Sequence, residues 1–199
     1  MSSPEPLTIA IIGAGFSGAL TAVNLLRHSG GRALRVVLLN RSGRMARGVA
    51  YGTASAGHLL NVPAGNMSAL DDDPDDFLRY CRWADPAVTP ASFVRRAQYG
   101  AYLEALLEAA QFGAPAGATI ERWVGEAVDL EPPARGRPGA VYVADGRRID
   151  ADHVVLAFGH FLRPTRRRCR RGCARAPATC ATRGCRGRWT AWAATSRCC

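Results

Sequence analysis

The sequence of 199 residues contains no lysine, so all 26 of its basic residues are arginine. Acidic residues are absent after Asp152, and the large apolar types Val, Ile, Leu, Met, Phe and Tyr are absent after Leu162. The formal net charge of +10 therefore arises after Leu162, and the preceding part is nearly neutral. This change in composition predicts one domain over residues 1–162 and a separate tail over residues 163–199.

The first 162 residues contain a single cysteine, Cys81, which excludes a scaffold held by disulfides. The chain opens without a basic segment, and its first apolar run, residues 7–12, ends at Gly13. That run is too short for a signal peptide or a membrane span. We therefore expect a cytoplasmic protein with no membrane partner and one buried core.

A strand, a glycine-rich turn, a helix and a second strand follow one another near the start of the chain. Residues 7–12 are apolar and largely β-branched, residues 13–18 read Gly-Ala-Gly-Phe-Ser-Gly, and apolar residues then recur at helical spacing. A second β-branched run occupies residues 34–39. A GxGxxG turn in this context is typical of a βαβ unit with parallel strands that binds a dinucleotide.

The three glycines of this turn have different expected roles. Gly13 permits the tight turn, Gly15 leaves room for a pyrophosphate at the backbone, and Gly18 lets the helix pack closely against the strand. The free amides near Phe16 and Ser17, together with the positive end of the helix dipole, then face the phosphates.

The acidic residue expected at the end of the second strand, about 20 residues after the glycines, is replaced by Asn40, which Arg41 follows. An asparagine can hydrogen-bond a ribose hydroxyl, but it does not repel a 2′-phosphate as a carboxylate would. Three alternatives stay open: a weakened FAD or NAD site, a site that tolerates NADP, and an asparagine that only caps the strand end.

The remaining segments extend the α/β pattern. The acidic run at residues 71–76 lacks the glycine and the terminal glutamate of a calcium loop, so it predicts a helix N-terminus and no metal site. Further predicted elements are a surface helix at 98–112, a strand at 119–130, a hairpin with an Asp-Gly turn at 140–149 and an apolar parallel strand at 153–158.

Several of these segments resemble a bacterial family of FAD/NAD(P)-binding flavoproteins, which looks related to two-dinucleotide-domain monooxygenases and to lysine and ornithine N-hydroxylases. The resemblance rests on the sequences RGVAYGT at residues 47–53, HLLNVPAGNMS at 58–68, DFLR at 76–79, RRAQYGAYL at 95–103 and HVVLAFGH at 153–160. Related flavoproteins commonly have Ala-Thr-Gly where this chain has Ala157-Phe158-Gly159, which calls close backbone packing at that turn into question.

The resemblance implies that FAD is the bound cofactor and that residues 48–68 surround its flavin, with Asn61 and Met67 near the ring. The sequence offers no residue that qualifies as a catalytic acid, base or nucleophile, and His58 is interpreted as a structural hydrogen-bonding group. The full set of candidate cofactor-binding residues is Gly13, Gly15, Phe16, Ser17, Gly18, Asn40, Arg41, Arg47, Asn61, Met67, Val128 and Gly159.

The expected fold is a Rossmann-like α/β FAD-binding domain with a parallel sheet and a small β-hairpin insertion, incomplete because the resembling family continues well beyond residue 162. The expected function is the FAD-binding portion of a flavin-dependent oxidoreductase that uses NAD(P)H, of monooxygenase type, acting on an unidentified small molecule. The alternatives are an NAD(P)-dependent dehydrogenase domain and a non-enzymatic nucleic-acid-associated protein that acts through its arginine-rich tail.

Three hypotheses account for the composition of residues 163–199. A zinc site is disfavoured because the six cysteines form no CxxC pair and no histidine accompanies them. An arginine-rich arm that binds nucleic acid is a second alternative. We favour a frameshift near Pro164, because Arg, Ala, Gly, Pro, Cys and Trp are the residues that GC-rich coding DNA yields out of frame.

The frameshift hypothesis predicts that another reading frame opens beyond codon 163 into a sequence with hydrophobic periodicity. Resequencing the coding DNA across codons 155–170 and translating all three frames onward tests this expectation. If no such frame exists, the tail is genuine, and nucleic-acid and metal binding become the leading hypotheses for it.

Overall fold

The computed structural model describes residues 5–55, 57–134 and 136–159. The predicted tail, the domain boundary at residue 162 and His160 lie outside the described residues. None of the helices in the described part of the chain has the length and apolarity needed to span a bilayer.

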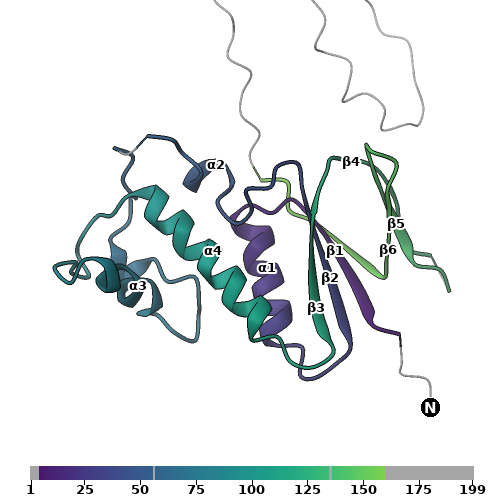
Figure 1. Ribbon diagram of the computed structural model, residues 1–199, viewed down its shortest axis with the longest axis horizontal. Coiled ribbons are helices and arrows are strands. Elements are labelled where there is room, and N and C mark those ends of the chain that lie inside the picture. Colours follow the sequence, from purple (N-terminus) through teal and green to yellow (C-terminus); the bar gives the residue numbers. More distant parts are fainter. Residues whose placement is uncertain (1–4, 56, 135, 160–199) are drawn as a thin grey trace, which may run out of the picture. The chain divides into compact units, whose positions relative to one another are not determined.

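A four-stranded parallel sheet forms the centre of the fold (Figure 1), with the strand order β3-β2-β1-β7. In β1, Ile9 lies opposite Val36 of β2 on one side and opposite His153 of β7 on the other. This pairing confirms the predicted βαβ unit and the predicted closing strand. The four strands are β1 (Leu7–Ile12), β2 (Leu34–Asn40), β3 (Ala118–Val124) and β7 (His153–Leu156).

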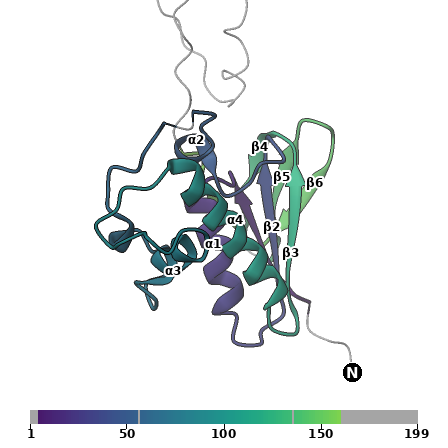
Figure 2. The ribbon, with the colours of Figure 1, turned by 60° about the vertical axis from the view of Figure 1, so that its left-hand side comes forward.

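Helices cover one face of this sheet, and Figures 1 and 2 show α1 and α4 running side by side across it. The core on this face joins Ile11 and Val36 of the sheet to Leu26 of α1 and Leu103 of α4, all of them fully buried. The helical elements are α1 (Phe16–Arg27), α2 (Gly48–Tyr51), the 3-10 turn η1 (Ala64–Asn66), α3 (Asp76–Ala84) and α4 (Arg96–Phe112).

A small antiparallel sheet covers the other face of the parallel sheet (Figure 1). It consists of β4 (Ala127–Glu131), β5 (Gly139–Val143) and β6 (Arg148–Ala151). Val141 and Ile149 of this sheet bury their side chains against Ala10 and Val37 of the parallel sheet. The hairpin between β5 and β6 confirms the turn predicted at Asp145-Gly146, where Gly146 has a φ of +89°.

The prediction of a single strand over residues 119–130 is wrong. The chain leaves the parallel sheet after β3 and enters the antiparallel sheet at β4, and Gly125 lies at this crossing. The amide of Gly125 donates to the carbonyl oxygen of Asn40 at 2.9 Å, which ends the parallel pairing. A Cβ on Gly125 would lie 2.6 Å from Cγ1 of Val143, so a larger residue at the crossing would force the side chain of Val143 to shift.

The acidic run of residues 71–76 precedes α3, as predicted, and Asp76 lies in the first turn of that helix. Arg27 of α1 forms a bidentate ion pair with Asp72, and Arg79 of α3 pairs with Asp73. Within the described ranges, no cluster of three His, Cys, Asp or Glu side chains is placed to hold a metal ion.

We expect the hydroxyl of Tyr102 to contribute measurably to the stability of the domain. It donates to Oδ2 of Asp76 at 2.7 Å and accepts from the amide of Ala69 at 3.2 Å, while Tyr102 is fully buried. We expect Tyr102→Phe to lower the free energy of unfolding by about 1–2 kcal/mol in urea titrations, because both partners lose a bond. The control is Tyr142→Phe, whose hydroxyl bonds the exposed Glu131; equal losses in the two variants would contradict this assignment.

Candidate functional site

The glycine-rich turn lies at the carboxyl end of β1 and leads directly into α1. Gly13 has a φ of +101°, and a Cβ there would lie 2.3 Å from the carbonyl oxygen of Ala157, which follows β7. A Cβ on Gly18 would lie 1.9 Å from the carbonyl oxygen of Gly13. Packing of the protein against itself therefore requires glycine at both positions.

Gly15 differs from its two neighbours in the motif, because the protein leaves space for a side chain there. Its φ is −75°, which any residue can adopt, and an added Cβ would meet nothing nearer than Cα of Gly48 at 3.6 Å. The fold does not require glycine at this position. The approach of a pyrophosphate to a backbone requires open space of this kind.

The first turn of α1 presents its amides at the same place. Gly15 is the N-cap residue, and among the described residues no side chain caps these amides and no acidic residue lies in the first turn. Phe16 and Ser17, which begin the helix, are exposed. The backbone there can donate hydrogen bonds to an anion, and the helix dipole favours negative charge.

Asn40, at the end of β2, connects the loop after that strand to the glycine-rich turn. Its Nδ2 donates to the carbonyl oxygens of Ser42 at 2.8 Å and Arg44 at 3.2 Å, and its Oδ1 accepts from the amide of Ala14 at 3.4 Å. A carboxylate could not donate to these carbonyls, which explains the asparagine at a position where an acid is usual. These contacts are those that a cap on the strand end makes, which is one of the three alternatives.

Two arginines of the predicted set are paired with acids. Arg41 contacts Glu126 at 3.3 Å on the surface. Arg47 forms two bonds with Glu104 of α4, from Nε to Oε1 at 2.6 Å and from Nη2 to Oε2 at 2.7 Å. The hydrogen-bonded carboxylate of Glu104 raises the pKa of Arg47, so the guanidinium stays charged and directed at this acid. Glu104 is absent from the candidate set predicted from the sequence.

The segment from Met45 to Gly52 lies against the glycine-rich turn. The amide of Ala46 donates to the carbonyl oxygen of Ala14 at 2.7 Å, and Ala46 is buried with a φ of +68°. A non-glycine residue in this left-handed conformation is uncommon and persists where the surroundings hold it. Gly48, with a φ of +56°, brings its backbone close enough to Gly15 that an added Cβ would lie 3.2 Å from Cα of Gly15.

The residues predicted to surround the flavin differ in burial. Asn61 is exposed, while Met67 is half-buried and packs against the helical core. The ring Nδ1 of His58 lies 2.7 Å from Oγ1 of Thr53, a contact of the structural kind expected for this histidine. The amide of Arg96 donates to the carbonyl oxygen of His58 at 2.8 Å, which attaches the loop to the start of α4.

Val128 and Gly159 lie on two other elements. Val128 is exposed in β4, at an irregularity in the pairing of β4 with β5. Gly159 follows β7 with a φ of +64°. Phe158 is exposed, and the approach of Ala157 to Gly13 shows that the close backbone packing at this turn is kept.

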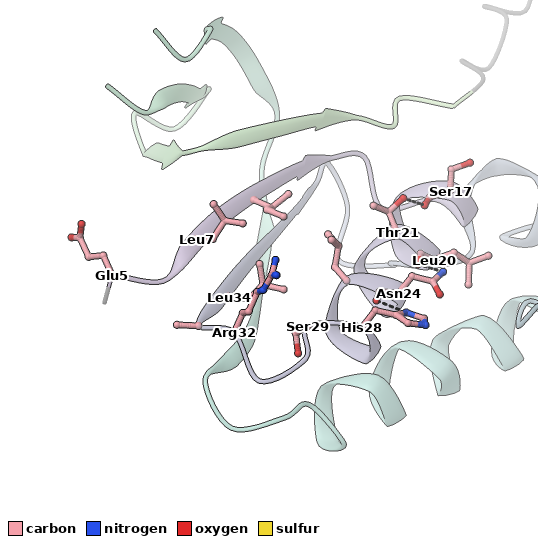
Figure 3. Close-up of a pocket in the computed structure, with 13 residues that line it drawn as sticks. Glu5, Leu7, Ser17, Leu20, Thr21, Asn24, His28, Ser29, Arg32 and Leu34 are labelled. Atoms are coloured by element: carbon pink, nitrogen blue, oxygen red, sulfur yellow. Dashed lines mark hydrogen bonds between the residues drawn. The ribbon is translucent and has the colours of Figure 1, made fainter. Parts of the chain in front are cut away.

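A cavity beside α1 lies apart from most of the predicted site (Figure 3). It has a volume of about 750 Å³ and follows the side of α1 toward the amino ends of β1 and β2. Ser17 is the one residue of the predicted set in its lining, which also includes Leu7, Leu20 and Leu34. The glycine-rich turn, by contrast, follows the carboxyl end of β1, where open α/β sheets bind ligands.

A parallel sheet with a GxGxxG turn, an uncapped helix amino end and a space kept open by Gly15 defines a dinucleotide-binding domain. The profile of the FAD-NAD(P)-binding family matches residues 10–161. The chain belongs to this family of FAD/NAD(P)-binding domains.

Solved structures of flavin monooxygenases share the fold. The closed structure of cyclohexanone monooxygenase is 18% identical, with a TM-score of 0.56, over 79% of this chain and 26% of that chain. Cyclohexanone monooxygenase from Rhodococcus sp. Phi1 bound to NADP+ is 19% identical, with a TM-score of 0.55, over 78% of this chain and 26% of that one. The chain thus spans about a quarter of their length. No curated protein sequence matches it significantly.

Cys81 of α3 provides a test of the packing of the helical core. Burial raises the pKa of its thiol to about 11, so the reactive thiolate is scarce at pH 8. We expect Cys81 to resist iodoacetamide in the native protein and to react after unfolding in urea, as measured by mass spectrometry of its peptide. Alkylation of the native protein at the rate of an unfolded thiol would contradict this expectation.

Proposed function

We propose that the chain is the FAD-binding portion of a flavin-dependent oxidoreductase of monooxygenase type that uses NAD(P)H to act on a small molecule. The observation that carries this proposal is the space at Gly15, which the protein leaves open beside the first amides of α1. Membership of the FAD-NAD(P)-binding family supports it. We further propose that residues 1–162 are the domain and that it acts in the cytoplasm.

The chain's own residues would bind and orient the cofactor. The amides at Phe16 and Ser17 would hold the pyrophosphate, and Asn40 would keep the loop after β2 in place beside it. Residues 48–68 would surround the flavin side. Bound FAD supplies hydride transfer or oxygen activation, while the protein supplies position and electrostatics.

The segment over the glycine-rich turn favours FAD over the simple NAD(P)-dependent dehydrogenase alternative. Gly48 approaches Gly15 from outside the βαβ unit, and the loop that continues from it is attached to α4 through His58 and Arg96. A long ordered loop placed next to a binding turn is usually functional. The NADP+ bound in one structure of the same fold supports NAD(P)H as the reductant.

The identity of the cofactor is tested directly. The full chain is purified, any bound dinucleotide is released by denaturation, and the released compound is identified by mass spectrometry and absorbance. The apoprotein is then titrated separately with FAD, NAD+ and NADP+. We expect FAD to be recovered or to bind most tightly. Recovery of NAD without flavin, or tighter binding of NAD+ than of FAD, would contradict the assignment.

Alanine substitutions in the glycine-rich turn separate binding from folding. Gly15→Ala should leave the urea midpoint almost unchanged, because its Cβ makes only ordinary contacts, yet it should weaken FAD binding roughly tenfold or more by filling the phosphate's space. Gly13→Ala is the matched contrast and should unfold the protein, because its Cβ overlaps the carbonyl of Ala157. FAD binding by Gly15→Ala equal to that of the unaltered chain would refute the role of this position.

A further inference from the structure

Glu104 holds Arg47 in one orientation from a helix that contributes none of the predicted cofactor-binding residues. Both carboxylate oxygens accept from the guanidinium, at 2.6 and 2.7 Å. The side chains of Arg47 and Glu104 retain 21% and 36% of their exposure, so water screens this pair less than a fully exposed one. A bidentate pair of this kind fixes the direction as well as the distance of both side chains.

A second contact on α4, one helical turn from Glu104, fixes the same segment. At Gly100 the helix lies so close to α2 that an added Cβ would be 2.7 Å from the carbonyl oxygen of Tyr51 and 3.1 Å from Cγ of Arg47. Positions 100 and 104 lie on one face of the helix. The turn from Arg47 to Tyr51 is therefore held at both of its ends by α4.

That turn lies in contact with the start of α1. An added Cβ on Gly48 would lie 3.2 Å from Cα of Gly15 and 3.6 Å from the amide nitrogen of Phe16. The ring of Phe16 in turn lies 6.0 Å from that of Tyr51 and 6.3 Å from that of Tyr99 on α4, measured between ring centres. The contacts with α4 that hold Arg47 and Tyr51 therefore also fix the distance between Gly48 and Gly15.

We propose that Glu104 is a positioning residue of the dinucleotide site. It keeps the guanidinium of Arg47 bound to α4 and thereby fixes Gly48 over Gly15, which sets the width of the opening above the first amides of α1. Arg47 then acts as a strap for the turn and does not contact the phosphates. The inference rests on the proposed binding of FAD at this turn.

The two roles of Arg47 predict opposite effects of changing Glu104. If Arg47 is a strap, Glu104→Gln releases the turn, and the dissociation constant of FAD, measured by quenching of flavin fluorescence, rises roughly tenfold. If Arg47 binds phosphate directly, the same change frees its charge, and FAD binds equally well or more tightly. Equal or tighter binding by Glu104→Gln overturns the proposal.

Two further variants sharpen the measurement. Glu108→Gln makes the same change at an exposed position one turn further along α4 and should leave FAD binding unchanged. Arg47→Gln should weaken binding as much as Glu104→Gln, and the double variant no more than either, because both remove one pair. Additive losses overturn the proposal, since they would mean that Arg47 and Glu104 act separately.

Hydrogen exchange without nucleotide distinguishes this inference from the proposed function. Glu104→Gln should speed exchange of the amides of residues 45–52, whereas Glu108→Gln should not; unchanged exchange in Glu104→Gln overturns the proposal. If the unaltered chain binds NAD+ but not FAD, the proposed function alone is contradicted, and the variants are then titrated with NAD+. If the unaltered chain binds no dinucleotide, both the proposed function and the positioning role of Glu104 are contradicted.

A Glu104→Gln variant with a lower urea midpoint but unchanged FAD affinity also overturns the positioning role, because Glu104 would then contribute to stability only.

Discussion

The close approach of three backbone segments at the carboxyl ends of β1, β2 and β7 is the constraint on which the remaining structure depends. The amide of Gly13 donates to the carbonyl oxygen of Leu39, and the amide of Ala157 donates to that of Ile12, each at 2.8 Å. Only glycine fits at Gly13 and Gly18 in this arrangement. Because the turn cannot move away from the sheet, the amino end of α1 is fixed at the edge where open α/β sheets bind their ligands.

The polar side chains around the turn are used mainly to hold it in shape. Asn40 satisfies two carbonyls of the loop after β2, and Arg47 is occupied by Glu104. The backbone amides at the start of α1 can serve as hydrogen-bond donors for an anion, and they need no side-chain entropy to be ordered for binding. The turn can therefore keep its shape with an asparagine at position 40, where an acidic residue is usual.

Local pattern was sufficient to predict the elements that one stretch of sequence determines, such as β1, α1, β2 and the hairpin at Asp145-Gly146. It could not predict the break at Gly125, because a strand has the same period of two in either sheet and the crossing depends on Val143. It also missed Glu104, since acids four residues apart on a helix are typical of a solvated face. The partner of Glu104 is 57 residues away in the sequence, a distance that no helical or strand period reports.

Because the chain contains no lysine, the basic partner in each ion pair between distant elements is an arginine. Arg27 with Asp72, Arg35 with Glu121 and Arg47 with Glu104 each form a pair of parallel hydrogen bonds, which only a guanidinium can offer to a carboxylate. Exposed pairs of this kind contribute little to stability. What distinguishes the pair of Arg47 is its place: it holds Gly48, whose backbone lies against Gly15, so a small displacement of the pair changes the space beside Gly15. An ion pair that contributes little to the free energy of folding can therefore still determine how well that space accepts a pyrophosphate.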